Sequence, residues 1–179
     1  MIKLRDMIES DIEDYVRWFI SDTEWGNWDA PWESYLSNDE KKERKEWTDY
    51  YNYVKDMSKD FERWKFEIEV DNKHIGWLSS YTDLEYLENK DKILAIGIDI
   101  PSPNNRCKGY GTIALKMFIK YLKERGHHFL YIQTWSGNIP MIKVIEKLGF
   151  KEYFRKIDYR EVKNEKYDAI TYILDLDKL

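Results

Sequence analysis

The fold is decided by the stretch IGIDIPSPNNRCKGYGTIALKMFIKYLKER, residues 96–125. Apolar side chains alternate with others up to Ile100, which is the period of a β-strand, and Pro101 ends the strand because proline has no N–H to donate. From Thr112 onward apolar side chains recur at helical spacing. A glycine-containing turn that enters a helix leaves several backbone N–H groups unpaired, and the helix dipole adds partial positive charge there. The stretch therefore predicts a strand, a loop suited to a phosphate or pyrophosphate, and a helix.

The loop itself, RCKGYG at residues 106–111, excludes two familiar nucleotide motifs. It has neither the three glycines of Gly-x-Gly-x-x-Gly nor the Gly-Lys-Ser/Thr of a P-loop. The pattern Arg106-x-x-Gly109-x-Gly111 instead resembles the acetyl-CoA pyrophosphate loop of the GCN5-related N-acetyltransferases (GNAT). Taken alone, these six residues could also form an ordinary strand–helix connection that binds no cofactor. A second landmark, Asn138 followed by EKLGF at residues 146–150, is similar to the asparagine–helix–EKxGF segment of the same family.

The rest of the chain predicts an α/β (α+β) fold built on one mixed sheet. A single crossover around the central strand makes that sheet mixed, with about seven strands and about four flanking helices. This order of elements resembles the GNAT fold, and within the family it resembles the ribosomal-protein N-terminal acetyltransferases, with the aminoglycoside 6′-N-acetyltransferases as near neighbours. We expect helices at 10–19 (opened by a Ser10–Glu13 capping box), 39–60, 112–125 and 138–148, and strands at 1–5, 66–70, 75–81, 94–100, 129–134, 151–161 and 167–176.

Composition narrows the class of protein. A length of 179 residues with 42% hydrophobic and 35% charged side chains predicts a single globular domain over residues 1–179. No apolar run approaches the roughly 20 residues that cross a bilayer, and the N-terminus lacks the apolar core of a signal peptide. The single cysteine excludes an intramolecular disulfide and a cysteine-based zinc cluster. The single cysteine also favours a cytoplasmic protein. The net charge of −5 argues against nucleic acid as the partner. We expect no membrane partner and no metal.

The resemblance implies acetyl-CoA as the acyl donor and assigns residues to it. It implies that strand amides at Ile98 and Ile100 hold the pantetheine and the thioester carbonyl, and that Asn138 bonds the cofactor arm. The alternative for Asn138 is a helix N-cap, and one residue can serve both roles. We read Cys107 as incidental to the chemistry because a thiol nucleophile needs a positioned base. The pyrophosphate would be held by the backbone of Arg106, Cys107, Lys108, Gly109, Tyr110, Gly111 and Thr112, with added charge from Arg106 and Lys108.

Asp99 is the candidate general base. A primary ammonium has a pKa near 10, so a carboxylate beside it is needed to take its proton at neutral pH. Aspartate is disfavoured in a buried strand, and Gly97-Ile98-Asp99 resembles the aminoglycoside 6′-type segment that carries the proposed base. The alternative is an aspartate paired with a cation or capping the turn at Pro101. Ile145 stands where many family members carry a proton-donating tyrosine, so no general acid is assigned.

A stretch of alternating tryptophans and acids at residues 22–35 suggests the acceptor site. Aromatic faces beside carboxylates suit a cationic amine, and family resemblance places the acceptor wall in this segment. The alternative is a hydrophobic lid or a homodimer surface. The proposed wall consists of Trp25, Trp28, Asp29, Trp32 and Glu33, joined by Tyr81 and Trp135.

The expected function is acetyl-CoA-dependent N-acetyl transfer to a cationic primary amine. The candidate acceptors are a protein or peptide N-terminus, an aminoglycoside-like antibiotic, and a polyamine or other small amine. The alternative is a non-catalytic sensor that binds an acyl-CoA without turnover.

Overall fold

The structure, a computed structural model, describes residues 1–32, 37, 39–84 and 93–179. Its described part contains one seven-stranded sheet with the order β1-β2-β3-β4-β5-β7-β6. Neighbouring strands are antiparallel except β4 and β5, which run parallel, so the expected mixed sheet is confirmed. The strands are β1 (Ile2–Arg5), β2 (Lys65–Val70), β3 (Lys73–Tyr81), β4 (Ala95–Asp99), β5 (Phe129–Trp135), β6 (Lys151–Val162) and β7 (Glu165–Asp175).

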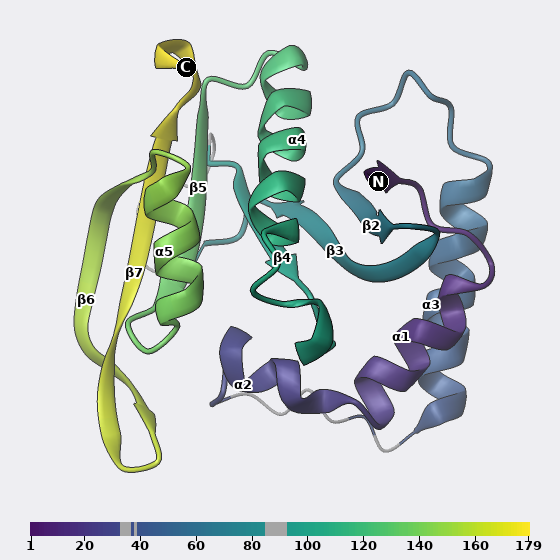
Figure 1. Cartoon of the computed structure of the whole chain (residues 1–179), viewed down its shortest axis with the longest axis horizontal. Coiled ribbons are helices and arrows are strands. Elements are labelled where there is room, and N and C mark those ends of the chain that lie inside the picture. Colours follow the sequence, from purple (N-terminus) through teal and green to yellow (C-terminus); the bar gives the residue numbers. More distant parts are fainter. Residues whose placement is uncertain (33–36, 38, 85–92) are drawn as a thin grey trace.

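Helices cover both faces of the sheet. Trp77 and Leu78 are neighbours on β3, and successive side chains of a strand point to opposite faces. Leu78 belongs to the core under α4 and α5, which stand in front of β4, β5 and β7 in Figure 1, whereas Trp77 packs with the aromatic residues of α1 and α3. The helices are α1 (Asp11–Ile20), α2 (Gly26–Asp29), α3 (Glu40–Lys55), α4 (Tyr110–Glu124) and α5 (Ile139–Lys147).

The first three helices differ from the sequence expectation. The capping box at Ser10 is wrong: Ser10 already has helical backbone angles and makes no side-chain cap bond, and the carboxylate of Asp11 accepts from the N–H of Ile8 at 2.9 Å instead. The second long helix stops at Lys55 rather than at 60. The short α2 was not expected, because four residues are too few to show a helical period.

The central helix α4 begins two residues earlier than its apolar period suggests. Its N-cap is Gly109, whose φ of 82° lies in the left-handed region that glycine adopts without strain. The buried side chains Ala114, Leu115, Phe118 and Leu122 then pack on the sheet. The sharp turn at Gly109 thus aims the start of α4 at the end of β4.

Strands β4 and β5 separate soon after they meet. Among the described residues they share a single register pair, Ala95 with Tyr131, and the N–H of Tyr131 donates to the C=O of Leu94 at 2.9 Å. Beyond that pair the facing edges of the two strands make no ladder. This opening lies below the start of α4 and positions the site.

No helix of the described residues is long and apolar enough to span a bilayer.

Candidate active site

The opening between β4 and β5 exposes main-chain groups of the central strand. Alternate residues of a strand direct their N–H and C=O toward the same neighbour, so Ile98 and Ile100 face β5 as Leu94 does. The C=O of Ile100 already accepts from Nε of Arg106 at 2.8 Å. The polar main-chain groups of Ile98 therefore line the opening, where the expected pantetheine contact requires them.

The glycine loop, residues 106–112, presents a row of unpaired donors. Among the described residues, the N–H groups of 107–112 make no hydrogen bond within the protein, and the first to do so is that of Ile113, which donates to the C=O of Gly109. Cys107 and Gly109 both have positive φ, which curls the loop around this row. Six free amides at the start of a 15-residue helix form an anion site.

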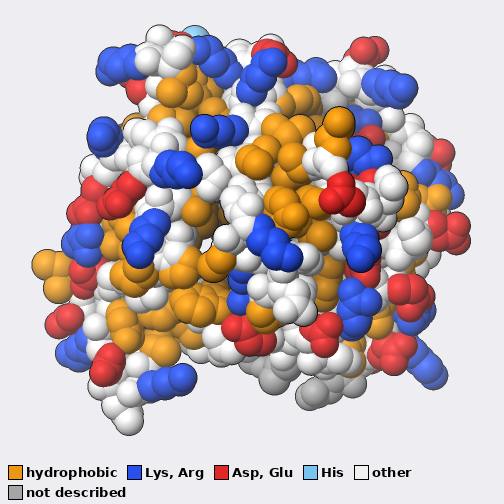
Figure 2. Space-filling view, in the orientation of Figure 1, with side chains coloured by type: hydrophobic (Ala, Val, Ile, Leu, Met, Phe, Trp, Pro, Cys, Tyr) orange, Lys and Arg blue, Asp and Glu red, His pale blue; other side chains and the backbone are white. Residues whose placement is uncertain are grey.

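The surface around this loop carries positive side chains. Lys and Arg side chains are spread over the middle of the face that bears α4 and α5, with hydrophobic side chains between them (Figure 2). Arg106 is engaged within the protein: besides Ile100 it contacts the C=O of Pro101, and its Nη2 lies 2.7 Å from a carboxylate oxygen of Glu24. Its guanidinium therefore fastens the glycine loop to the end of β4 and to the segment before α2, and Lys108 is the more exposed charge of the loop.

Asn138 performs two structural tasks. Its Oδ1 accepts from the N–H of Met141 at 3.2 Å, so the N-cap role is confirmed, and its Nδ2 donates to the C=O of Trp28 at 2.7 Å. The indole N–H of Trp135 donates to the same carbonyl at 2.8 Å. The end of β5 and the start of α5 together hold α2 beside the opening.

Asp99 lies on the opposite face from Ile98 and Ile100, opposite Trp77 in the register of β3. Burial raises the pKa of its carboxyl well above the ordinary value, and the negative charge of Asp29 raises it further. The positive charges of Lys65 and Arg106 act in the other direction. Asp29 and Asp99, hereafter the acidic pair, come from segments 70 positions apart in the sequence, and the structure brings them together.

Tyr81 borders the acidic pair. Its ring passes 3.7 Å from the point where a Cβ at Gly97 would lie, so the ring packs beside Gly97 on β4. Burial and then the charges of Asp29 and Asp99 raise the pKa of its phenol. Tyr81 therefore keeps its proton beside two carboxyl groups.

The expected tryptophan wall separates into a core residue and a surface group. Trp25 is only 4% exposed, and its indole N–H donates to the C=O of Trp18 at 3.0 Å, so little of its ring is available to a ligand. Trp28 is 40% exposed. Trp32 packs edge-on against Trp135, and its indole N–H has no hydrogen-bond partner among the described residues. Glu33 lies outside the described residues.

A buried lysine behind the acidic pair escaped the sequence analysis. Lys65 is 6% exposed, and burial lowers its pKa to about 8, although the charges of Glu67 and Asp99 oppose that change. The apolar residues that alternate in β2 predict one buried face, whereas Lys65 lies on the opposite face, which the structure also buries. Four ring centroids surround its Nζ: Tyr15 at 4.3 Å, Trp47 at 4.3 Å, Tyr50 at 5.2 Å and Trp77 at 5.3 Å.

His74 joins a charged cluster under α1. Its Nε2 is 3.0 Å from Glu67, and its Nδ1 is 3.2 Å from Asp14 and 3.4 Å from Asp11. Burial lowers its pKa, but the hydrogen bonds to Asp14 and Glu67 outweigh burial and raise it to about 9. The ligand atoms of Asp11, Asp14 and His74 lie within 4.8 Å of one another, a spacing that also suits a metal ion. A metal would have to displace the ring proton that the carboxylates hold, so the arrangement fits an imidazolium better.

Comparisons with known proteins agree with this geometry. Residues 2–151 match the family model described as acetyltransferase (GNAT) domain. An N-alpha-acetyltransferase of Sulfurisphaera tokodaii is 30% identical over 112 residues, which are 58% of this chain and only 65% of that relative's length.

Solved structures share the fold over nearly the whole chain. An N-acetyltransferase from Staphylococcus aureus Mu50 has a TM-score of 0.69 at 18% identity and covers 98% of this chain and 99% of its own. A ribosomal-protein-alanine N-acetyltransferase from Brucella melitensis has a TM-score of 0.70 at 19% identity, with coverage of 97% and 99%. A protein from Salmonella typhimurium, solved with its cofactor acetyl-CoA, has a TM-score of 0.72 at 15% identity, with coverage of 99% and 95%.

Proposed function

Because the chain belongs to the acetyltransferase (GNAT) family, we propose that it moves the acetyl group of acetyl-CoA to a primary amine of a cationic acceptor. The observation that carries the proposal is the acidic pair on one face of β4, beside a strand edge and a loop whose amides are free. An anion site and a cation site thus meet at one strand. We further propose that residues 1–179 form one domain and that the reaction takes place in the cytoplasm, as the single cysteine favours.

The donor half of the site would hold acetyl-CoA. Its pyrophosphate suits the six free amides of residues 107–112, with Lys108 adding charge. The main-chain groups of Ile98 that face the opening would bond the pantetheine and polarise the thioester carbonyl, stabilising the negative charge that develops on its oxygen. The side-chain amide of Asn138 already donates one N–H to Trp28. Its contact with the cofactor would use the second N–H of Nδ2 or the second lone pair of Oδ1.

The acceptor half would prepare the amine. An ammonium placed at the acidic pair is attracted by two carboxylates, and Asp99 takes its proton. A raised pKa makes Asp99 a stronger base than an ordinary aspartate, which suits this task. The neutral nitrogen then attacks the thioester carbon, the nitrogen loses its second proton to water as the amide forms, the carbon–sulfur bond breaks, and the thiolate leaves. Ile145 is fully buried and apolar, whereas Tyr81 keeps its proton beside Asp99, which makes Tyr81 our candidate donor to the thiolate.

We propose an α-amino group at a protein or peptide N-terminus as the acceptor. The names of two similar proteins, the N-alpha-acetyltransferase and the ribosomal-protein-alanine N-acetyltransferase, support this class. An α-ammonium has a pKa near 8, so less free energy is needed to deprotonate it than a side-chain ammonium. The exposed face of Trp28 offers a contact to the following residues of a peptide.

The decisive experiment combines acetyl-CoA titration with a thiol-release assay over peptides with free or blocked N-termini and a panel of small amines. Asp99→Asn should lower kcat/KM by about 10²- to 10⁴-fold and leave acetyl-CoA affinity nearly unchanged. Asp49→Asn, the same change on the exposed side of α3, should leave both unchanged. Unchanged turnover in Asp99→Asn would remove Asp99 from the base role. If the folded protein does not bind acetyl-CoA, the proposed donor site is refuted. If it binds acetyl-CoA but releases no thiol with any amine, the protein is a non-catalytic sensor rather than an enzyme.

A further inference from the structure

A cavity of about 540 Å³ lies between α5 and the hairpin of β6 and β7. This volume is in the range of small-ligand sites. The cavity is on the α5 face of the sheet, because its wall residues Ile170 and Tyr172 belong to the core under α4 and α5. The acidic pair lies on the other face, so the cavity is separate from the proposed acceptor site.

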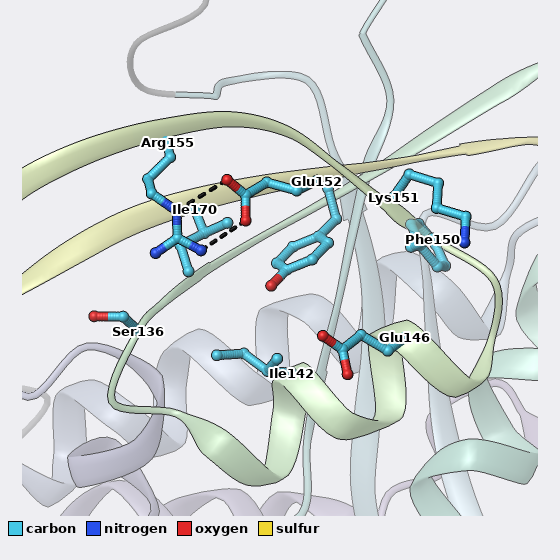
Figure 3. A pocket seen from close by; sticks show the side chains of 9 residues that line it. Ser136, Ile142, Glu146, Phe150, Lys151, Glu152, Arg155 and Ile170 are labelled. Atoms are coloured by element: carbon cyan, nitrogen blue, oxygen red, sulfur yellow. Dashed lines mark hydrogen bonds and ion pairs between the residues drawn. The ribbon is translucent and has the colours of Figure 1, made fainter.

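The cavity has an apolar side and a charged side. Figure 3 shows Ile142 and the carboxylate of Glu146 on α5, facing Ile170 and the ion pair of Glu152 and Arg155 across the cavity. Among the described residues, the carboxylate of Glu146 makes no ion pair and no hydrogen bond. An apolar stem can lie along the isoleucines while its charged end reaches Glu146.

The guanidinium at the cavity is not available to an anion. Nε and Nη2 of Arg155 bind Glu152 at 2.9 and 2.6 Å, and its Nη1 binds Asp168 at 2.7 Å. Lys151 lies beside Phe150 at one end, with its ammonium turned away from Glu146 (Figure 3). The guanidinium is therefore neutralised by two carboxylates, and Glu146 adds a third negative charge.

A buried tyrosine whose hydroxyl has no hydrogen-bond partner among the described residues lines the cavity. Tyr172 is 4% exposed and lines the cavity, and its hydroxyl makes no hydrogen bond within the part of the chain that the structure describes. Burial raises the pKa of the phenol, and the negative charges of Glu152 and Glu146 raise it further. The positive charge of Arg155 lowers this pKa, but its effect is the smallest of the four. The hydroxyl therefore stays neutral, lies in a negative field and has an oxygen free to accept a hydrogen bond.

We propose that this cavity binds a small organic cation, a primary ammonium on a short apolar stem, with the ammonium between Glu146 and the hydroxyl of Tyr172. The ammonium donates to the carboxylate and to the phenol oxygen, and the stem lies against Ile142 and Ile170. The site is separate from the proposed acetyl-transfer site, because it shares no lining residue with the glycine loop and lies on the other face of the sheet from the acidic pair.

The test is an NMR titration of the full-length protein with n-butylammonium chloride. Saturable shifts should map to the amides of Ser136, Glu146, Arg155 and Ile170, whereas sodium butyrate at equal ionic strength should produce none. Glu146→Gln and Tyr172→Phe should each weaken binding at least about tenfold, because each removes a hydrogen bond to a charged group. Glu124→Gln, the same change on the exposed end of α4, should change binding less than twofold.

Three results would overturn the proposal. They are the absence of saturable shifts, shifts confined to residues around the acidic pair, and equal weakening by Glu124→Gln and Glu146→Gln. Glu146 is exposed, so Glu146→Gln decides the question even if Tyr172→Phe disturbs folding. Loss of acetyl-CoA binding or of turnover tests the proposed function separately, because neither involves this cavity.

Discussion

Replacing Lys65 with methionine would reveal which force governs the buried ammonium of β2. Four aromatic rings surround its Nζ at 4.3–5.3 Å, and ring faces attract a cation. Burial removes the water that would otherwise solvate the charge, and this cost is the larger, because the pKa falls from 10.5 to about 8. Methionine keeps a similar length and an apolar surface against the rings, but it carries no proton to lose.

The sign of the effect on folding follows from the two pKa values. In the folded protein Lys65 loses its proton near pH 8, and in the unfolded chain near pH 10.5. Between these values the unfolded state holds the additional proton, so a rise in pH favours the folded state. The destabilising cost is thus fully present below pH 8 and is relieved by pH 10.5. A difference of about 2.5 pKa units at about 1.4 kcal/mol each corresponds to about 3.5 kcal/mol in full, of which about 3 kcal/mol is recovered by pH 10.5.

Urea unfolding of both proteins from pH 6.5 to pH 10.5 measures this quantity. The free energy of unfolding of the parent protein, minus that of Lys65→Met, should be constant below pH 7 and should then rise by about 3 kcal/mol. The matched control is Lys55→Met, because Lys55 also lies over a ring, that of Tyr51 at 5.5 Å, but on the exposed side of α3. Its difference should be flat. If the difference in unfolding free energy for Lys65→Met is also independent of pH, the reasoning is refuted. The four rings would then compensate for the hydration that the ammonium loses on burial.

Three further substitutions test the neighbourhood of the acidic pair. Asp29→Asn removes a charge that raises the pKa of Asp99, so the acid limb of kcat/KM against pH should move to lower pH. An unmoved limb would show that the charge of Asp29 does not act on Asp99. Gly76→Ala would place a Cβ 2.0 Å from the carbonyl oxygen of Asp99, so we expect a loss of about 2 kcal/mol in urea unfolding and a fall in kcat/KM. Trp135→Phe removes the N–H that bonds Trp28, so KM for the acceptor should rise more than KM for acetyl-CoA in steady-state kinetics.

The donor half of the site could be predicted because it is local in sequence. The strand, the glycine loop and α4 follow one another within residues 96–125, and each has its own signal in that stretch. The strand ends at a proline, the loop turns at Gly109 and the helix shows its apolar period. Contacts between distant segments are not needed to recognise such a unit, and the structure confirms its order with small shifts in the helix and strand boundaries.

The acceptor half could not be predicted to the same depth because distant packing builds it. The alternation in β2 indicates one buried face, that of Phe66 and Ile68, whereas the structure also buries Lys65 and Glu67 under α1 and α3. The alternating tryptophans and acids at residues 22–35 suggested an acceptor wall, but that pattern could not show that Trp25 belongs to the core. The pairing of Asp29 with Asp99 depends on where α2 is held, which no local pattern reveals.

The geometry of a single strand explains why the two halves meet at Asp99. Successive residues of β4 face opposite ways, so the main chain of Ile98 lines the opening that we propose for the donor, while the side chain of Asp99 faces the proposed acceptor site. A shift of β4 by one residue would exchange these roles and place an isoleucine at the amine. Gly76 opposes that shift, because its bare Cα lets the carbonyl of Asp99 approach closer than any side chain would permit. The position of the proposed base is therefore set by a glycine on the neighbouring strand as much as by the strand that carries it.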